Sequence, residues 1–121
     1  MRVRCIENKL GHAAFGVEIG KEYPVLALEA GVGGSWFPPG MVVFVGREHN
    51  YTQVPISCVE IIDPNVDSVW KIGCVQSRWL IGYPQMLDEA FHIGLERQDD
   101  PRFAQMYGKL LQTAGERNRH G

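Results

Sequence analysis

The pattern of hydrophobic residues changes near residue 75, and this change restricts the folds that the chain can adopt. Before it, short runs of β-branched and aromatic residues alternate with Gly and Pro turns, which is typical of β-strands. After it, apolar residues recur at helical spacing in two segments. The sequence therefore predicts an α+β fold in which residues 1–75 are mostly β, residues 80–115 form two helices and residues 116–121 are a frayed tail.

The bulk properties indicate a single domain spanning residues 1–121. A net charge of −2 argues against a protein whose whole surface binds nucleic acid. The sequence contains no run of about 18 apolar residues, which is the length that a membrane-spanning helix needs. The first residues also lack the apolar stretch of a signal peptide. We therefore expect a cytoplasmic protein that does not bind membranes.

The β part is expected to contain five or six short strands. Residues 41–45 form the clearest buried strand because they are continuously apolar. Turns about every 8–12 residues favour a small barrel or sandwich. The expected strands are residues 3–6, 22–29, 41–45, 51–54 and 58–62, with a further one near residues 68–72.

The two helices are expected to pack on this β part, because the break at residues 74–77 is too short for an interdomain linker. Pro84 suits the first position of the first helix. Asp100 and Pro101 suit the N-cap and first position of the second helix, and Gly115 is its expected end. The apolar stripes are Tyr83, Leu87, Ala90, Phe91, Gly94 and Leu95 on the first helix and Phe103, Met106, Tyr107, Leu110, Leu111 and Ala114 on the second.

The first predicted helix is strongly acidic on the face opposite its apolar stripe. Residues 84–100 contain five acids and one base, a net charge of −4, which leaves the rest of the chain at +2. One interpretation is a docking face for an electropositive partner. The other is a solvated face whose early acids complement the helix dipole. The residues of this face are Asp88, His92, Glu96 and Asp99, with Glu89 beside them.

Large aromatic residues suggest two further roles. Trp36 and Phe37 follow a glycine-rich stretch and are either an exposed anchor for a partner or a plug of the core. Trp70 and Trp79 flank the change of pattern and are expected to pack the two parts together. Trp36 and Phe37 join the acidic face as candidate partner-binding residues.

The sequence contains no pattern of catalytic, cofactor-binding or metal-binding residues that predicts an enzyme. The histidines make no triad with the serines, and no serine lies in a GxSxG context. Asp88, His92 and Glu96 have i, i+4, i+8 spacing, but without an HExxH pairing they make only a weak metal site. We expect no catalytic residue, no cofactor and no metal.

The three cysteines each lie in an apolar run. Cys5, Cys58 and Cys74 are odd in number, and their spacings match no zinc pattern. We expect buried, reduced thiols. The sequence leaves open a single Cys5–Cys74 or Cys58–Cys74 bridge.

Two sets of segments resemble known bacterial sequences. The first comprises residues 3–8, Leu10 and residues 20–26 (GKEYPVL), and it resembles small SH3-like barrel proteins of bacteria and phages. The second comprises residues 59–63, 66–70, 83–91 and 99–103. It resembles the C-terminal part of immunity proteins that are encoded beside polymorphic toxins, including contact-dependent inhibition systems.

The resemblance implies a small SH3-like barrel or a strongly bent antiparallel sheet of five or six strands, with two C-terminal helices packed on it. It also implies a non-enzymatic protein that binds and neutralises a cognate toxin domain in the cytosol. Many such toxins are nucleases with positively charged clefts, which an acidic face would suit.

Two alternatives to this function stay open. One is an SH3-like module that recognises a peptide or nucleic acid through a basic or aromatic barrel face. The other is a small enzyme, which requires polar groups converging in a pocket. The sequence does not predict the oligomeric state. The basic residues that would support the SH3-like module, if they cluster, are Arg2, Arg4, Lys9 and Lys21.

Overall fold

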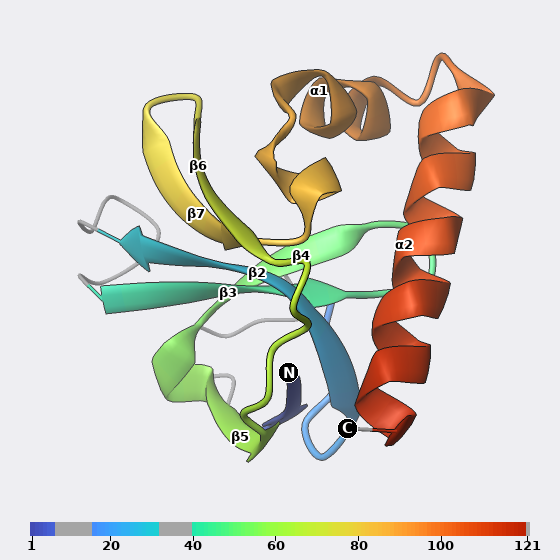
Figure 1. Cartoon of the computed structure of the whole chain (residues 1–121). Coiled ribbons are helices and arrows are strands. Elements are labelled where there is room, and N and C mark those ends of the chain that lie inside the picture. Colours follow the sequence, from blue (N-terminus) through green and yellow to red (C-terminus); the bar gives the residue numbers. More distant parts are fainter. Residues whose placement is uncertain (7–15, 32–39, 121) are drawn as a thin grey trace.

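The computed structural model describes residues 1–6, 16–31 and 40–120, the last five of these as backbone only (Figure 1). The described part has the predicted α+β fold: seven antiparallel strands form an open sheet, and two helices follow. Two 3₁₀ helices, η2 (Ile56–Cys58) and η3 (Pro84–Leu87), connect these elements. The strands are β1 (Arg2–Cys5), β2 (Glu22–Gly31), β3 (Gly40–Gly46), β4 (Tyr51–Pro55), β5 (Val59–Asp63), β6 (Lys71–Val75) and β7 (Arg78–Gly82), and the helices are α1 (Glu89–Arg97) and α2 (Pro101–His120).

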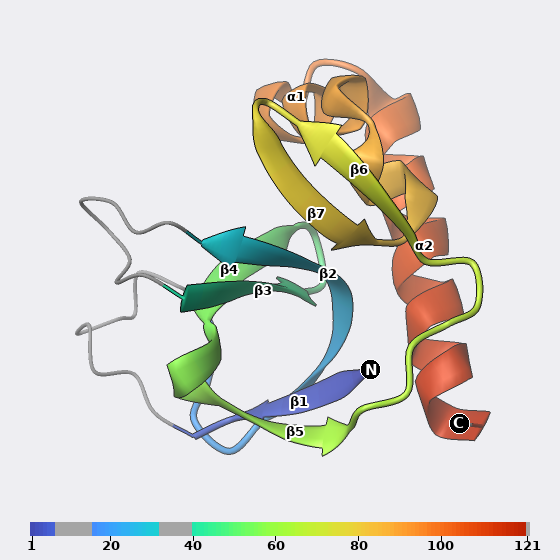
Figure 2. The same cartoon turned by 60° about the vertical axis from the view of Figure 1, so that its left-hand side comes forward.

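Strand β2 holds the sheet together because it pairs along both of its edges. One edge runs beside β3, which in turn pairs with β4. The other edge is shared, since its first residues pair with β1 and residues Ala27 to Glu29 pair with β7. A register shift between Val25 and Ala27 marks a β-bulge, which bends the strand. Figure 2 shows β2 curving from the β1–β5 pair toward the β6–β7 hairpin.

Two hydrophobic cores lie on opposite faces of the sheet, and β3 contributes to both. Because successive side chains of a strand point to opposite faces, Val42 and Phe44 face the helices, while Val43 and Val45 face β1 and β5. This explains why residues 41–45 read as a continuous apolar run. The helix-covered core includes Leu26, Leu80, Tyr83, Met86, Phe91, Leu95, Tyr107, Leu110 and Ala114, and the second core includes Val3, Cys5, Tyr23, Val25, Val54, Cys58 and Val59.

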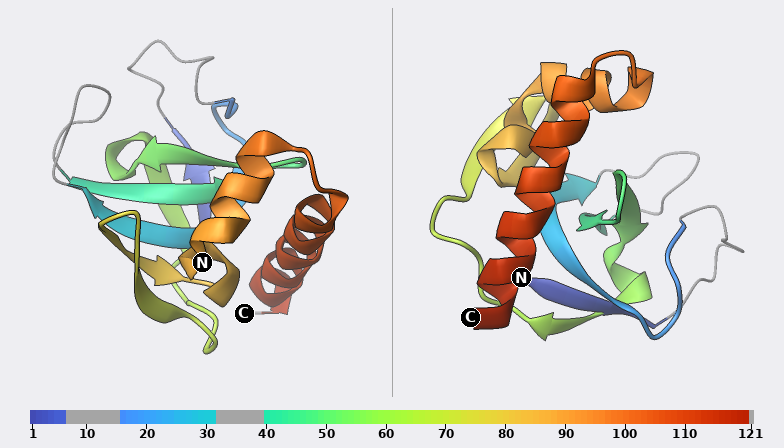
Figure 3. Two further views of the ribbon diagram at one scale, coloured as in Figure 1. Left: turned by 90° about the horizontal axis from the view of Figure 1, so that it is seen from above. Right: turned by 90° about the vertical axis from the view of Figure 1, so that its right-hand side faces the viewer.

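Helix α2 packs against β2 and begins as predicted (Figure 3). The Asp100 carboxylate accepts a hydrogen bond from the backbone N–H of Arg102 at 2.9 Å, as an N-cap should. Further along, the buried Tyr107 hydroxyl accepts a hydrogen bond from Arg47 N–H at 2.9 Å and donates one to the Arg47 carbonyl. These bonds join α2 to the turn that follows β3.

The β part extends further along the chain than predicted. Residues 74–77 are not a break, because Gln76 and Ser77 have φ angles of 51° and 65° and form the two-residue turn between β6 and β7. The strand expected near residues 68–72 is β6, which begins later, and β7 occupies positions assigned to a helix. Pro84 begins η3, whereas α1 begins at Glu89.

Two other predictions concern the end of α2 and the closure of the sheet. Gly115 does not end α2, which continues to His120 through the segment expected to be frayed. Glycine lowers helix propensity without forbidding a helix, and no strong stop follows it. The sheet is open rather than closed, since β4, β5 and β6 are each paired on one edge only among the described residues. An SH3-like barrel is therefore not confirmed.

Gly82 lies where β7 passes closest to β2. A Cβ at this position would overlap the Leu26 carbonyl oxygen and the Ala27 side chain. We expect Gly82→Ala to lower the free energy of unfolding by about 1–3 kcal/mol in urea denaturation. The control is Gly108→Ala in α2, where a Cβ meets nothing within 4 Å and should raise stability by about 1 kcal/mol. Equal effects of the two variants would contradict the close approach.

Candidate functional site

The acidic residues of the predicted docking face do not form one stripe. Glu89 and Glu96 are exposed and lie about two helical turns apart on the same side of α1. Asp88 precedes the helix as its N-cap, and its Oδ1 accepts a hydrogen bond from Ala90 N–H at 3.0 Å. Asp99 is exposed beyond the end of α1. The carboxylates therefore give the α1 segment a negative surface without a continuous acidic face.

His92 was predicted on the exposed face, and this is wrong, because the residue is only 7% exposed. Its Nε2 lies 2.6 Å from the Met86 carbonyl oxygen, which can only accept a hydrogen bond, so Nε2 carries a proton. In the neutral ring, Nδ1 then accepts a hydrogen bond from the Tyr51 hydroxyl at 2.6 Å. Burial raises the pKa of Tyr51. This chain of bonds connects α1 to β4 and opens onto none of the cavities described below.

A buried ion pair between Glu29 and Arg78 lies on the helix-covered face, and no pattern in the sequence predicted it. Glu29 is 7% exposed, and its cross-strand neighbours, Val42 and Leu80, both belong to the helix-covered core. Arg78 Nε lies 3.1 Å from Glu29 Oε1, close enough for an ion pair, although the geometry does not make a hydrogen bond. The pair joins β2 to β7 and explains how a carboxylate is tolerated at this depth.

The opposite face of the β6–β7 hairpin is apolar, and none of the described residues covers it. Leu28, Ile81 and Ile72 are direct cross-strand partners on β2, β7 and β6. Ile72 is 69% exposed, and Trp79, which was expected to pack between the two parts, is 65% exposed. Trp70, in contrast, packs as predicted, edge-on against Tyr83. We call the exposed apolar surface of the hairpin, to which Trp70 does not belong, the open face. It consists of Leu28, Ala30, Met41, Ile72, Cys74, Trp79 and Ile81, and most of these residues line a hollow of about 230 Å³.

The open face exists because the described elements cover only part of this side of the sheet. Leu28 packs against the second core, which β1 and β5 cover. Beyond Leu28, the same side of the sheet continues onto Ile81 and Ile72, where no described element covers it. An apolar sheet face left uncovered in this way is a common mark of a protein-binding surface.

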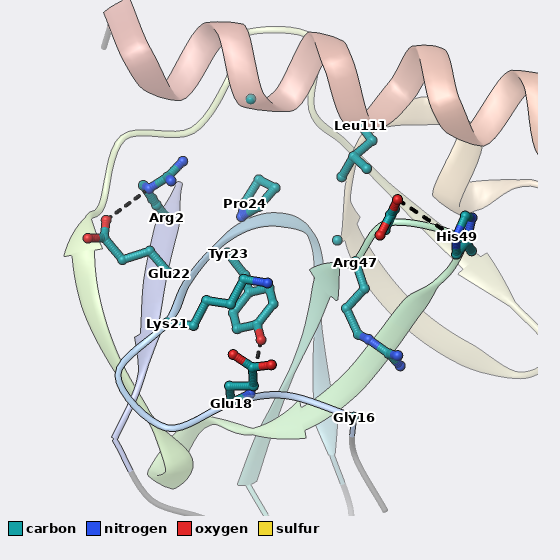
Figure 4. Close-up of a pocket in the computed structure, with 13 residues that line it drawn as sticks. Arg2, Gly16, Glu18, Lys21, Glu22, Tyr23, Pro24, Arg47, His49 and Leu111 are labelled. Carbon is teal, nitrogen blue, oxygen red and sulfur yellow. Dashed lines mark hydrogen bonds and ion pairs between the residues drawn. The ribbon is translucent and has the colours of Figure 1, made fainter. Parts of the chain in front are cut away.

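A second, larger cavity of about 470 Å³ lies between the start of β2, the turn after β3 and α2 (Figure 4). Its charged residues are mixed in sign. Arg2 Nε binds Glu22 Oε1 at 2.9 Å, and Arg4 contacts Glu22 at 3.3 Å. The hydrogen bond from Arg2 holds the pKa of Glu22 below its ordinary value. Arg2 and Arg4 do cluster, but on carboxylates, so they leave no basic patch. The three acids and three bases that line this cavity are Glu18, Glu22, Glu48, Arg2, Lys21 and Arg47.

The remaining candidates are two aromatic residues, one lysine and the three cysteines. Trp36, Phe37 and Lys9 lie outside the described residues. All three cysteines are reduced thiols, and Cys5 and Cys58 are buried as expected, whereas Cys74 is exposed. Cys74 lies two residues after Ile72 on β6, so both side chains point to the open face. The apolar residues around Cys74 in the sequence did not indicate this exposure.

Within the described residues, no three side chains of the metal-binding types come together in a site. None of the described helices has the length and apolar character needed to cross a membrane. Comparisons with protein families, with characterised proteins and with solved structures find no match to this chain.

Tyr51→Phe tests the bond between Tyr51 and His92. Removing the hydroxyl leaves a buried Nδ1 without a donor, so we expect the free energy of unfolding to fall by about 1–3 kcal/mol at neutral pH. The raised pKa of Tyr51 adds a second signature. Above the ordinary tyrosine pKa of about 10, the unfolded chain loses this proton and the folded chain keeps it, so stability falls as pH rises.

The alkaline loss of stability should be shallower in Tyr51→Phe than in the unmodified protein, as measured by urea denaturation between neutral pH and pH values above 10. Unchanged stability at neutral pH together with an unchanged alkaline slope would mean that the Tyr51 hydroxyl makes no such bond in solution.

Proposed function

We propose that this protein is a non-enzymatic immunity protein, which binds and neutralises a cognate toxin domain in the cytosol. The observation that carries the proposal is the open face. A tryptophan and an isoleucine, each about two-thirds exposed, stand side by side with other apolar residues around a hollow. Tryptophan is the residue most enriched among those that dominate protein–protein binding energies, and it is effective where neighbours exclude water.

The acids around α1 support a basic partner. Asp88, Glu89, Glu96 and Asp99 are all exposed, and the segment from residue 84 to residue 100 carries −4 of charge in a chain of −2. Surface charge of this kind accelerates association with a positively charged protein, such as a nuclease with a basic cleft. The open face would then supply the slow dissociation, because most differences in affinity arise in the dissociation rate.

The SH3-like binding module remains the second candidate, and the open face supports a peptide as its ligand. Nucleic acid is the weaker choice for such a module. Arg2 and Arg4 are engaged by Glu22, and Arg4 also lies 3.8 Å from Glu60, so the basic residues offer little net charge to a phosphate backbone.

The proposed function is tested by a pull-down from the native host with this protein as bait, followed by mass spectrometry. We expect a toxin domain in near-equal amounts, and we expect that co-expression of this protein restores growth of cells that express that domain. Recovery of nucleic acid alone, or of a partner whose toxicity this protein does not relieve, would contradict the proposal.

Trp79→Ala tests the open face against the captured toxin domain. We expect dissociation to accelerate by at least about 30-fold, which corresponds to about 2 kcal/mol. The matched control is Met106→Ala, because Met106 is an exposed apolar residue on α2, outside the open face. An unchanged dissociation rate in Trp79→Ala would remove the open face from the interface.

The double variant Glu89→Lys/Glu96→Lys tests the acidic surface. We expect slower association and a weaker dependence of the association rate on salt, measured by surface plasmon resonance. Asp88 is left intact because it caps α1. Glu48→Lys is the control, since Glu48 is 87% exposed in the turn after β3. Equal effects of the double variant and the control would mean that the net charge of the protein, and not the acidic surface around α1, sets the association rate.

A further inference from the structure

The β6 strand is a free edge that lies directly beside the open face. Among the described residues it pairs only with β7. The other two edge strands carry features that discourage pairing with another chain. Strand β4 ends in Pro55, which has no N–H, and β5 carries Glu60 and Asp63 within five residues. In β6 the only charged residue is Lys71, at its first position.

The register of the hairpin determines which backbone groups of β6 face the free edge. In a hairpin closed by a two-residue turn, the residues that flank the turn form a hydrogen-bonded pair, and hydrogen-bonded and non-hydrogen-bonded pairs then alternate. Val75↔Arg78 flanks the turn, so Val75, Gly73 and Lys71 bond to β7. The N–H and C=O groups of Ile72 and Cys74 therefore point outward, to the side where an additional strand would lie.

The same two residues carry side chains of the open face. Ile72 ends the cross-strand row that begins at Leu28 and passes through Ile81, and Cys74 stands opposite Trp79. An added strand with apolar residues at alternate positions would extend both rows. Its backbone would satisfy the outward groups of β6, and its side chains would cover Ile72 and the edge of Trp79.

A second copy of this chain fits the edge less well than a different protein does. Two β6 strands paired antiparallel about a two-fold axis would place both open faces on the same side of one continuous sheet. The exposed apolar surface would then double rather than become buried. A partner whose structure extends beyond the added strand can lie over the open face as well.

We propose that the protein partner supplies an extended strand that pairs with the free edge of β6 and places apolar side chains over the open face. This inference rests on the proposed binding function and adds the form of the partner segment, which is a strand with apolar residues at alternate positions. Strand addition of this kind takes affinity from main-chain hydrogen bonds and specificity from alternate side chains.

The probe for this inference is a phage-displayed library of random linear peptides, selected on the full chain under reducing conditions. We expect enriched peptides to carry apolar residues at alternate positions, and we expect a synthetic peptide of that sequence to slow hydrogen exchange at the Ile72 and Cys74 amides. Enriched peptides without alternation, or protection confined to other parts of the protein, would overturn the proposal.

Cys74→Pro and Cys74→Val form the matched pair of variants. Proline removes the outward N–H, which an edge strand tolerates because β7 does not use it, whereas valine removes only the thiol. We expect the peptide to bind about ten-fold more weakly to Cys74→Pro than to Cys74→Val. Equal affinities, with both variants folded by circular dichroism, would overturn strand addition.

N-methylation of the peptide decides the matter if Cys74→Pro does not fold. Two peptides are compared, one methylated at its odd-numbered amides and the other at its even-numbered amides. One should lose binding and the other should bind nearly as before, because only every second amide of an added strand faces β6. Equal effects of the two methylation patterns would overturn the proposal, and so would a concentration-dependent dimer that excludes the peptide.

These outcomes separate the two proposals. Strand-like binding of peptides without any neutralised toxin would overturn the immunity function while supporting the role of the β6 edge. Neutralisation of a toxin whose affinity is the same for Cys74→Pro and Cys74→Val would retain the function and overturn strand addition.

Discussion

The bend in β2 is the constraint on which the rest of the structure depends. The bulge between Val25 and Ala27 turns the strand so that its beginning pairs with β1 and its end pairs with β7. This arrangement requires Gly82, because the Leu26 carbonyl oxygen lies where a Cβ of residue 82 would stand. The same oxygen accepts a hydrogen bond from Tyr83 N–H at 3.0 Å, so the chain leaves β7 close against β2 and enters η3.

The open face follows from this bend. Helices α1 and α2, with η3, cover one side of the sheet, including the part made by β7 and β6. On the other side, β1 and β5 follow only the first half of β2, so their cover ends near Leu28. The alternation that buries Val75 and Leu80 beneath η3 necessarily turns Ile72 and Trp79 outward. The exposed apolar residues are therefore a consequence of topology, because the part of the chain that the structure describes contains no third layer to cover them.

The strands and the second helix could be predicted from sequence because their signals are local. Residues 41–45 are apolar on both faces, and Asp100–Pro101 forms a helix start. Strand β7 was missed because its turn, Gln76–Ser77, lacks the Gly or Asn that normally marks positive φ angles. His92 was misplaced because a polar residue counts as exposed in a helical pattern, whereas its partners, Tyr51 and Met86, are set by tertiary structure. Nothing in the sequence links Glu29 to Arg78.

The β6–β7 hairpin is well suited to bind a strand because the fold already orders it. An isolated two-stranded hairpin is marginally stable in water, but three contacts with the rest of the protein hold this one in place. Strand β7 pairs with β2, and Arg78 reaches the buried Glu29. Leu87 of η3 packs against Gly73 so closely that a Cβ there would lie 3.2 Å from its Cδ1. A partner strand would therefore meet an edge that is already in its bound geometry, and little binding free energy would be lost in ordering it.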